Sequence, residues 1–149
     1  MAEADAEREV TITRVFDAPR GLVWKEWTEP ERLALWWGPR GWSTQPGVIE
    51  MDVRPGGVFR VTSVSDEDGA EMTTEGVYRE VAEPERLVFE EAAEGAWHAG
   101  AVTVVTFADL GDVRTEMVFH TRIRTTKEDL DTAVAGMSSA FDRLAEQLA

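Results

Sequence analysis

The stretch from Asp17 to Trp42 reads DAPRGLVWKEWTEPERLALWWGPRGW and contains five of the six tryptophans of the chain. An indole ring is large and apolar, and its single N–H needs a hydrogen-bond partner when the ring is buried. So many indoles in one short stretch indicate either a core plug between short helices or the wall of a pocket. The stretch is therefore informative about the fold and only partly about the function.

Two helix starts follow each other in this stretch. A capping side chain followed by a proline in the first turn is typical of a helix N-terminus, and a glutamate three residues after a threonine completes a capping box. A Gly-Pro pair then ends the second helix. The start signals are Asp17 and Pro19 for the first helix and Thr28, Pro30 and Glu31 for the second, and the stop signal is Gly38-Pro39.

The segments on both sides of this stretch have the composition of strands separated by tight turns. β-branched and aromatic residues dominate the segments, and Gly, Pro and Asp lie between them. Sequential strands joined by short turns predict an antiparallel meander. The expected strands are Glu9–Phe16, Ser43–Asp52, Gly57–Ser65, Met72–Ala82, Arg86–Glu91, Gly100–Ala108 and Val113–Arg124.

The C-terminal segment changes to spacings of three and four residues, which predict a helix with one apolar face. One helix can cover only one face of such a sheet, so we expect the sheet to curve around it. The predicted fold class is α+β: a curved, seven-stranded antiparallel sheet wrapped around a long C-terminal helix, with two short helices after the first strand. The apolar positions of the helix are Leu130, Val134, Met137, Phe141, Leu144 and Leu148.

The chain has 149 residues, a formal net charge of −14 and no cysteine. This length fits one domain, which we expect over residues 9–149 after an acidic N-terminal tail at residues 1–8. The negative charge argues against nucleic acid and anionic membrane surfaces as partners, because clustered Lys and Arg bind both. With no apolar run long enough to span a bilayer and no signal peptide, we expect a cytoplasmic protein. The excess of arginine over lysine points to a bacterial source.

Four motifs in this order resemble the START/Bet v 1-like (SRPBCC) superfamily, and within it the family named after activators of the heat shock protein 90 ATPase. They are FDAPRGLVWKEWTEPERLALWWGP at residues 16–39, DVRPGG at 52–57, EGVYREVAEPERLVF at 75–89 and GMSSAFDRLAEQL at 136–148. In the last motif Met137 follows the glycine, where this family often has a tryptophan. The resemblance runs from about Val10 to Leu148 and implies the helix-grip fold.

The resemblance implies three alternative functions, because this superfamily includes lipid carriers, hormone receptors, cyclases and hydrolases on one scaffold. The first is binding of an apolar or aromatic small molecule in a cavity between the sheet and the C-terminal helix. The second is a cyclase or hydrolase acting on a polyketide-like substrate. The third is a chaperone-partner or regulatory interaction protein, although direct activation of the chaperone ATPase is not carried over to this chain.

Tryptophans near the end of the second helix are the expected pocket walls. They flank the Gly38-Pro39 break, where the backbone turns away and cannot fill the space itself. Trp24, inside the first helix, is expected in the core. Trp97 belongs to the segment EEAAEGAWHAG, and we weigh it as a lid over the cavity against plain packing on a strand edge. The expected walls are Trp36, Trp37 and Trp42.

Polar side chains on the central strands are candidates for orienting or converting a ligand. Arg60 and Glu75 would have to pair if they point inward, and solvent-facing hairpin charges are the alternative. His120 shares a strand face with charged residues, so an exposed histidine is favoured over an acid or base in the cavity. The catalytic candidates are His120, Glu75 and Tyr78, and the ligand-binding candidates are Trp36, Trp37, Trp42, Arg60, Glu75, Trp97 and His120.

The sequence offers no pattern for a metal site or a covalent nucleophile. His98 and His120 are the only histidines and form no helical pair, and no serine lies in a known nucleophile motif. We therefore expect no metal and no cofactor. The expected partner is a hydrophobic or aromatic small molecule, and the sequence leaves a homodimer open.

Overall fold

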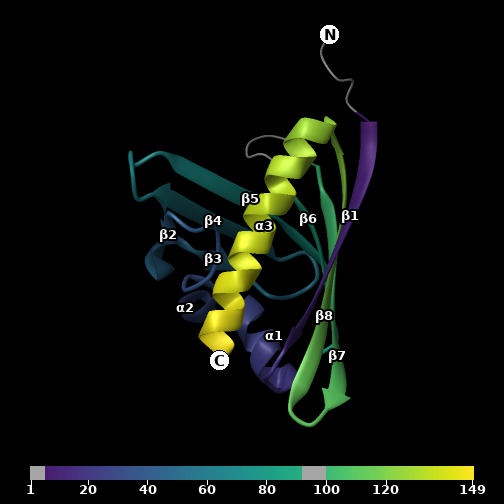
Figure 1. Ribbon diagram of the computed structural model, residues 1–149. Coiled ribbons are helices and arrows are strands. Elements are labelled where there is room, and N and C mark those ends of the chain that lie inside the picture. Colours follow the sequence, from purple (N-terminus) through teal and green to yellow (C-terminus); the bar gives the residue numbers. More distant parts are fainter. Residues whose placement is uncertain (1–5, 92–99) are drawn as a thin grey trace.

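The computed structural model describes residues 6–91 and 100–149 as an antiparallel sheet with a long helix across one face (Figure 1). The predicted α+β helix-grip fold is confirmed. The helices are α1 (Arg20–Thr28), α2 (Pro30–Leu33) and α3 (Lys127–Leu148), with a short 3-10 helix, η1, at Pro46–Val48. The strands are β1 (Ala6–Phe16), β2 (Trp42–Thr44), β3 (Glu50–Met51), β4 (Val58–Ser65), β5 (Glu71–Ala82), β6 (Arg86–Glu91), β7 (Val102–Gly111) and β8 (Arg114–Thr125).

The strands form one open sheet in the order β1-β8-β7-β6-β5-β4-β2, and β3 also pairs with β4. This gives eight strands where the sequence predicts seven, because the expected strand at residues 43–52 is divided. Pro46 and Gly47 lie at the division, and the amide of Val48 bonds back to the carbonyl O of Gln45 at 3.1 Å. Proline has no N–H to give to a strand ladder, so the segment turns there.

The two short helices begin where predicted, but the predicted side-chain caps do not form. Pro19 and Glu29 occupy the N-cap positions, and neither side chain makes a capping hydrogen bond. The hydroxyl of Thr28 instead donates to the carbonyl O of Trp24 at 3.0 Å, within α1. A hydroxyl used in this way is not free to cap the next helix. The proline positions therefore mark the helix starts better than Asp17 and Thr28 do.

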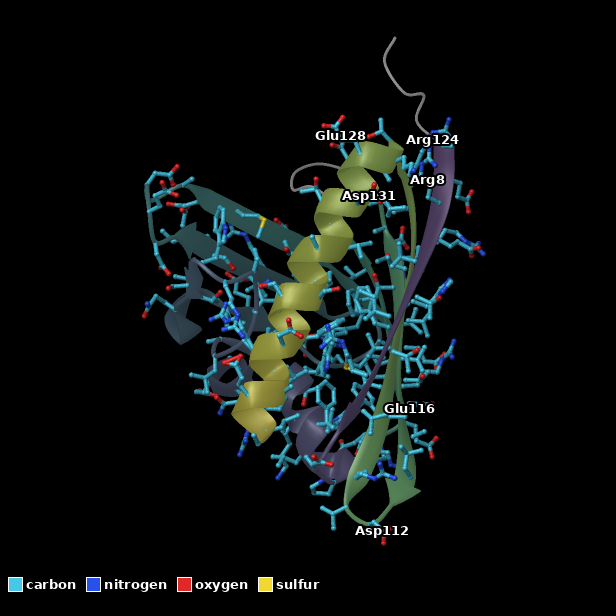
Figure 2. The ribbon with its side chains drawn as sticks, viewed as in Figure 1. Arg8, Asp112, Glu116, Arg124, Glu128 and Asp131 are labelled. Atoms are coloured by element: carbon cyan, nitrogen blue, oxygen red, sulfur yellow. The ribbon has the colours of Figure 1, made fainter. Side chains whose placement is uncertain are left out.

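Helix α3 crosses the inner face of the sheet, with α1 and α2 near its C-terminal end (Figure 1). Its N-cap is Thr126, whose hydroxyl accepts from the amide of Asp129 at 3.1 Å. Figure 2 shows Glu128 at this end of the helix, with Arg8 and Arg124 on β1 and β8 at the same end. Acidic side chains in the first turn stabilise the helix by interacting with the positive end of its dipole. No helix of the described residues is long and apolar enough to span a bilayer.

The core is centred on Trp27, which is 3% exposed. Its ring meets six other aromatic rings at centroid distances from 4.9 to 6.5 Å, which come from the segment after α2, the sheet and α3. Trp24 is also buried and meets Phe107 edge-on at 5.8 Å, which confirms its expected place in the core. The six rings around Trp27 are Trp36, Trp37, Phe89, Phe107, Phe119 and Phe141.

Candidate functional site

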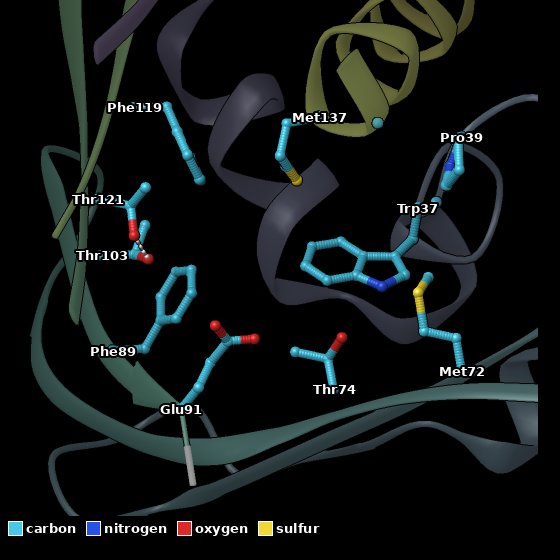
Figure 3. Close-up of a pocket in the computed structure, with 12 residues that line it drawn as sticks. Trp37, Pro39, Met72, Thr74, Phe89, Glu91, Thr103, Phe119, Thr121 and Met137 are labelled. Carbon is cyan, nitrogen blue, oxygen red and sulfur yellow. Dashed lines mark hydrogen bonds between the residues drawn. The ribbon is translucent and has the colours of Figure 1, made fainter. Parts of the chain in front are cut away.

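A pocket lies between α3 and the inner face of the sheet (Figure 3). It is narrow and has a volume of about 510 Å³, part of which is open to solvent. Its walls come from the segment after α2, from four neighbouring strands and from α3. The lining residues are Trp37, Gly38, Pro39, Met72, Thr74, Phe89, Glu91, Thr103, Phe119, Thr121, Gly136 and Met137.

Most of the lining is apolar. Trp37 forms one side of the pocket, and Phe89 and Phe119 lie on the opposite side (Figure 3). Met72 of β5 and Met137 of α3 complete the apolar surface. Thioether side chains are flexible and polarizable, so they can shift to admit a ring between the aromatic walls. This combination of walls suits a flat apolar molecule.

One carboxyl group points into this apolar space. Glu91 is the last residue of β6, and Figure 3 shows its carboxyl group directed into the pocket. Within residues 6–91 and 100–149 this carboxyl has no hydrogen-bond or ion-pair partner. The side chain is half-buried, and loss of water around the carboxyl raises the pKa of Glu91 to about 8. The group therefore carries a proton at neutral pH.

The sheet holds the backbone of Glu91 from both sides. Gly76 of β5 is opposite Glu91, and a Cβ on Gly76 would clash with the backbone carbonyl O of Glu90. The amide of Glu91 donates to the carbonyl O of Ala101 at 2.9 Å on the other side. The missing side chain of Gly76 lets β5 approach β6 closely here. The position of the carboxyl group thus follows from strand pairing.

Three threonine hydroxyls lie on the same wall of the pocket. Thr103 donates to the hydroxyl of Thr121 at 3.0 Å, and Thr121 donates to the carbonyl O of Val102 at 3.4 Å. Each hydroxyl has one hydrogen, so the oxygen of Thr103 is left only to accept. The hydroxyl of Thr74 lies close to Glu91 in the pocket (Figure 3) and bonds to no other described residue.

Arg143 of α3 holds the segment that carries Trp37. Its Nη1 donates to the backbone carbonyl O of Gly38 at 2.9 Å and of Trp42 at 3.2 Å, and its Nη2 donates to that of Leu35 at 3.3 Å. Burial lowers the pKa of Arg143, and so does the neighbouring Arg40. Backbone carbonyls thus take the place of a carboxylate partner. The turn after α2 is fixed against α3 by this side chain.

Two smaller pockets adjoin the first. One, of about 340 Å³, shares Trp37 and Phe89 with it and is also lined by Tyr78. The other, of about 260 Å³, shares Phe119 and Met137 with it and lies against β1 and β8. Of these two pockets, only the second has lining residues on α3.

Of the four tryptophans predicted for the site, the structure describes three and places them differently. Trp37 lines the pocket. Trp36 is fully buried in the core instead, and its Nε1 donates to the backbone carbonyl O of Glu26 at 3.1 Å. Trp42 is half-buried in β2 and is not among the lining residues. Trp97 lies outside the described residues. Consecutive residues on a helical turn point in different directions, which explains why Trp36 and Trp37 differ.

Arg60, Glu75 and His120 lie on the outer face of the sheet and do not line the pocket. Arg60 and Glu75 do pair, with 3.6 Å between Nε and Oε2, but their side chains are 48% and 53% exposed. His120 lies beside Thr11, with 2.9 Å between Nδ1 and Oγ1, and beside Glu9, with 3.4 Å between Nε2 and Oε1. The strand alternation places the apolar neighbours of these residues inward and so turns their own side chains outward.

Tyr78 is the one catalytic candidate on the inner face. It is buried in the adjoining pocket, and burial, with a smaller effect of Asp52, raises its pKa well above the usual range. Glu75 and His120 lie on the opposite face of the sheet. The structure therefore does not bring the three candidates His120, Glu75 and Tyr78 together as an acid–base group.

The pocket offers hydrogen-bonding groups more suited to an organic ligand than to a metal. Among the described lining residues, its polar side-chain groups are one carboxyl, three hydroxyls and the indole N–H of Trp37. Among the described residues, no three His, Asp or Glu side chains come together to hold a metal ion. His98 lies outside those residues.

The sequence predictions missed the polar wall of the pocket. Glu91, Thr74 and Thr103 were not among the candidates. The signal for Glu91 is the alternation of its own strand, because it lies two residues after Phe89 and four after Leu87 on the same face. A carboxyl continuing a buried apolar row could have been singled out on that basis.

The family model described as "Activator of Hsp90 ATPase homolog 1-like protein" matches residues 17–149. A solved structure from Chromobacterium violaceum is similar, with a TM-score of 0.81 and 21% identity over 95% of this chain and 97% of that chain. One from Nitrosomonas europaea has a TM-score of 0.80 and 24% identity over 94% and 93%. The AHSA1 protein from Silicibacter pomeroyi has a TM-score of 0.81 and 17% identity over 95% and 97%. These identities show the fold alone, and no curated protein matches the chain.

Proposed function

Because the chain belongs to the family of activator of Hsp90 ATPase homolog 1-like proteins, we propose that it binds an apolar or aromatic small molecule between α3 and the sheet. The supporting observation is the lining of the pocket. Aromatic and thioether walls surround a carboxyl group that no described residue pairs. The fold of this family is consistent with ligand binding, and this pocket is the place we assign to it.

A protein interior is normally packed as tightly as an organic crystal, and a buried polar group without a partner is destabilising. The region around Trp27 is closely packed by aromatic rings, although Nε1 of Trp27 and Oε1 of Glu26 there have no hydrogen-bond partner among the described residues. The pocket departs from this rule through its empty space and through the carboxyl of Glu91, which no described residue pairs. Binding of a ligand would account for both departures, because it fills the space and supplies a partner.

The driving force would be burial of apolar surface, at roughly 25 cal/mol per Å². Indane, a rigid hydrocarbon of two fused rings, is a suitable probe because it can only report apolar burial. Its binding can be measured by calorimetry or by ligand-observed NMR. We expect the wild-type protein to bind indane at a single site.

Trp37→Ala should weaken this binding by about tenfold, because the loss of about 60 Å² of contact corresponds to about 1.5 kcal/mol. Trp42→Ala is the matched control, since Trp42 is close in sequence and does not line the pocket. It should leave the affinity within about twofold of the wild type. Equal losses in the two variants, or no binding of indane to the wild type, would contradict the proposal.

A further inference from the structure

The carboxyl and hydroxyl groups of the pocket gather on one wall. Glu91, Thr74 and Thr103 come from three neighbouring strands, β6, β5 and β7 (Figure 3). No other titratable or charged side chain of the described residues lines the pocket, whether from the turn after α2, from β5, β7 and β8, or from α3. Apart from the indole N–H of Trp37, the described residues therefore offer the ligand apolar side chains everywhere except at this wall.

The hydrogens on this wall can be assigned. The hydrogen of Thr103 is already given to Thr121. The protonated carboxyl of Glu91 has a hydrogen that no described residue accepts. An O–H group held in an apolar space without an acceptor is unfavourable, and a ligand oxygen that accepts it removes that penalty. The wall thus presents a donor to the pocket.

The surroundings of Glu91 also favour a ligand without charge. An anionic ligand would face the Glu91 carboxyl in a chain with a net charge of −14. A cationic ligand would form a buried ion pair, for which both charges must leave water, and the attraction often does not repay that cost. A neutral ligand with an acceptor oxygen takes the hydrogen bond and buries no charge.

We propose that Glu91 anchors the ligand by donating a hydrogen bond, and that the ligand is a neutral, flat apolar molecule with a carbonyl oxygen at one end. The ring would lie between Trp37 and the pair Phe89 and Phe119, with the oxygen towards the wall of β5, β6 and β7. This inference rests on the proposed function and adds the chemical class of the ligand to it.

The proposal predicts how binding changes with pH. The carboxyl can donate only while it is protonated, and the pKa of Glu91 is raised to about 8. The preference for a carbonyl ligand should therefore be present below this pH and be lost as the pH rises through it. A cationic ligand would show the reverse trend, because the carboxylate that attracts it forms as the pH rises.

Three probes of matched shape distinguish a purely apolar ligand, a neutral carbonyl ligand and a cationic ligand: indane, 1-indanone and 1-aminoindane. At about pH 6 the wild type should bind 1-indanone about three- to tenfold more tightly than indane, which corresponds to one net hydrogen bond. At about pH 9 this ratio should fall to about one. The ammonium form of 1-aminoindane should bind no better than indane at about pH 6.

Variants at residue 91 test whether Glu91 causes the preference for 1-indanone over indane and its dependence on pH. Glu91→Gln keeps an N–H donor that does not titrate, so the preference for 1-indanone should persist at both pH values. Glu91→Leu has no donor, so the preference should disappear at both. Glu90→Gln is the matched control, because Glu90 lies next in the chain and pairs with Arg79 on the other face of β6. It should retain the wild-type preference and its pH dependence.

Two results would overturn the inference while the proposed function stands. One is binding of indane and 1-indanone with equal affinity at about pH 6, and the other is tighter binding of 1-aminoindane with rising pH that Glu91→Gln abolishes. If none of the three probes binds the wild type, the proposed function itself fails. These outcomes are distinguishable in one set of titrations.

Discussion

Among the described residues, burial raises the pKa of two carboxyl groups, one in the aromatic core and one in the pocket. Glu26 is 0% exposed among the core rings, and its Oε2 lies 3.3 Å from Nη1 of Arg32. Glu91 faces the pocket and has no partner among the described residues. Burial raises the pKa of both groups, but Arg32 opposes the effect at Glu26. The core thus pairs one oxygen of its acid with Arg32 and leaves Oε1 without a hydrogen-bond partner among the described residues, whereas neither oxygen of the acid in the pocket has such a partner.

The two regions should respond very differently to loss of side-chain volume, and this is the largest expected effect. Phe141 is 0% exposed in the core, so Phe141→Ala should lower the free energy of unfolding by roughly 3–5 kcal/mol. Met137, one turn earlier on α3, lines the pocket, and Met137→Ala should lose less than about half as much. Urea denaturation measures both. A loss below about 1 kcal/mol for Phe141→Ala would show that α3 does not pack as described.

Adjacent tryptophans provide the second comparison. Trp36→Phe removes the hydrogen bond to the carbonyl O of Glu26 and leaves a void, so it should cost about 2–3 kcal/mol of stability. Trp37→Phe should cost less than about 1 kcal/mol and should weaken indane binding, because its ring lines the pocket. Thermal melts and indane titrations on both variants check this. The comparison breaks down if Trp36→Phe weakens binding more than Trp37→Phe does.

Arg143 connects the two regions by holding the turn that carries Trp37. Arg143→Met removes its bonds to backbone carbonyls and should cost about 1.5–2 kcal/mol, with weaker indane binding in protein that remains folded. Arg14→Met is the control, because Arg14 also contacts α3, through Asp142 at 2.7 Å, but does not contact the pocket segment. The control should lose stability without loss of affinity. If the two variants bind indane with equal affinity, Arg143 does not position the pocket segment.

The smallest expected effect, counted per pH unit, is the pH dependence of stability caused by Glu91. The folded protein keeps the proton up to a pH of about 8, while the usual pKa of the group is 4.5. The folded state therefore binds more protons between these values, and stability falls as the pH rises from about 4.5 to about 8. Glu91→Gln removes this contribution, so its stability relative to the wild type should increase by up to about 1.4 kcal/mol for each pH unit across that window. A pH series of thermal melts measures it, and a constant difference would contradict the raised pKa.

The sequence predicted most of the fold because its signals are local and periodic. The prolines of the first helices, the turns between strands and the three- and four-residue spacing of α3 each depend on only a few neighbouring residues. The errors occurred where local signals compete. Thr28 was expected as a cap but bonds to Trp24 within α1. The segment at residues 43–52 reads as a strand but breaks at Pro46.

The site was less predictable, because it depends on which side chains from distant segments meet. Trp36 and Trp37 are neighbouring tryptophans that the sequence alone does not distinguish. The turn that follows α2 decides which ring faces the pocket. The alternation of its strand shows that Glu91 points inward, but it does not show that the carboxyl lacks charged neighbours. That conclusion requires knowing that β5, β7 and α3 bring no charged side chain to it in the described part of the chain.

Methionine methyl groups allow the central claim to be tested directly. Met72 and Met137 line the pocket, whereas Met117 is 0% exposed in the core and serves as an internal reference. NMR of protein labelled at the methionine methyl carbons, titrated with 1-indanone, should show the resonances of Met72 and Met137 moving together to saturation while that of Met117 stays in place. No movement at Met72 and Met137, or equal movement at Met117, would contradict a ligand site between α3 and the sheet.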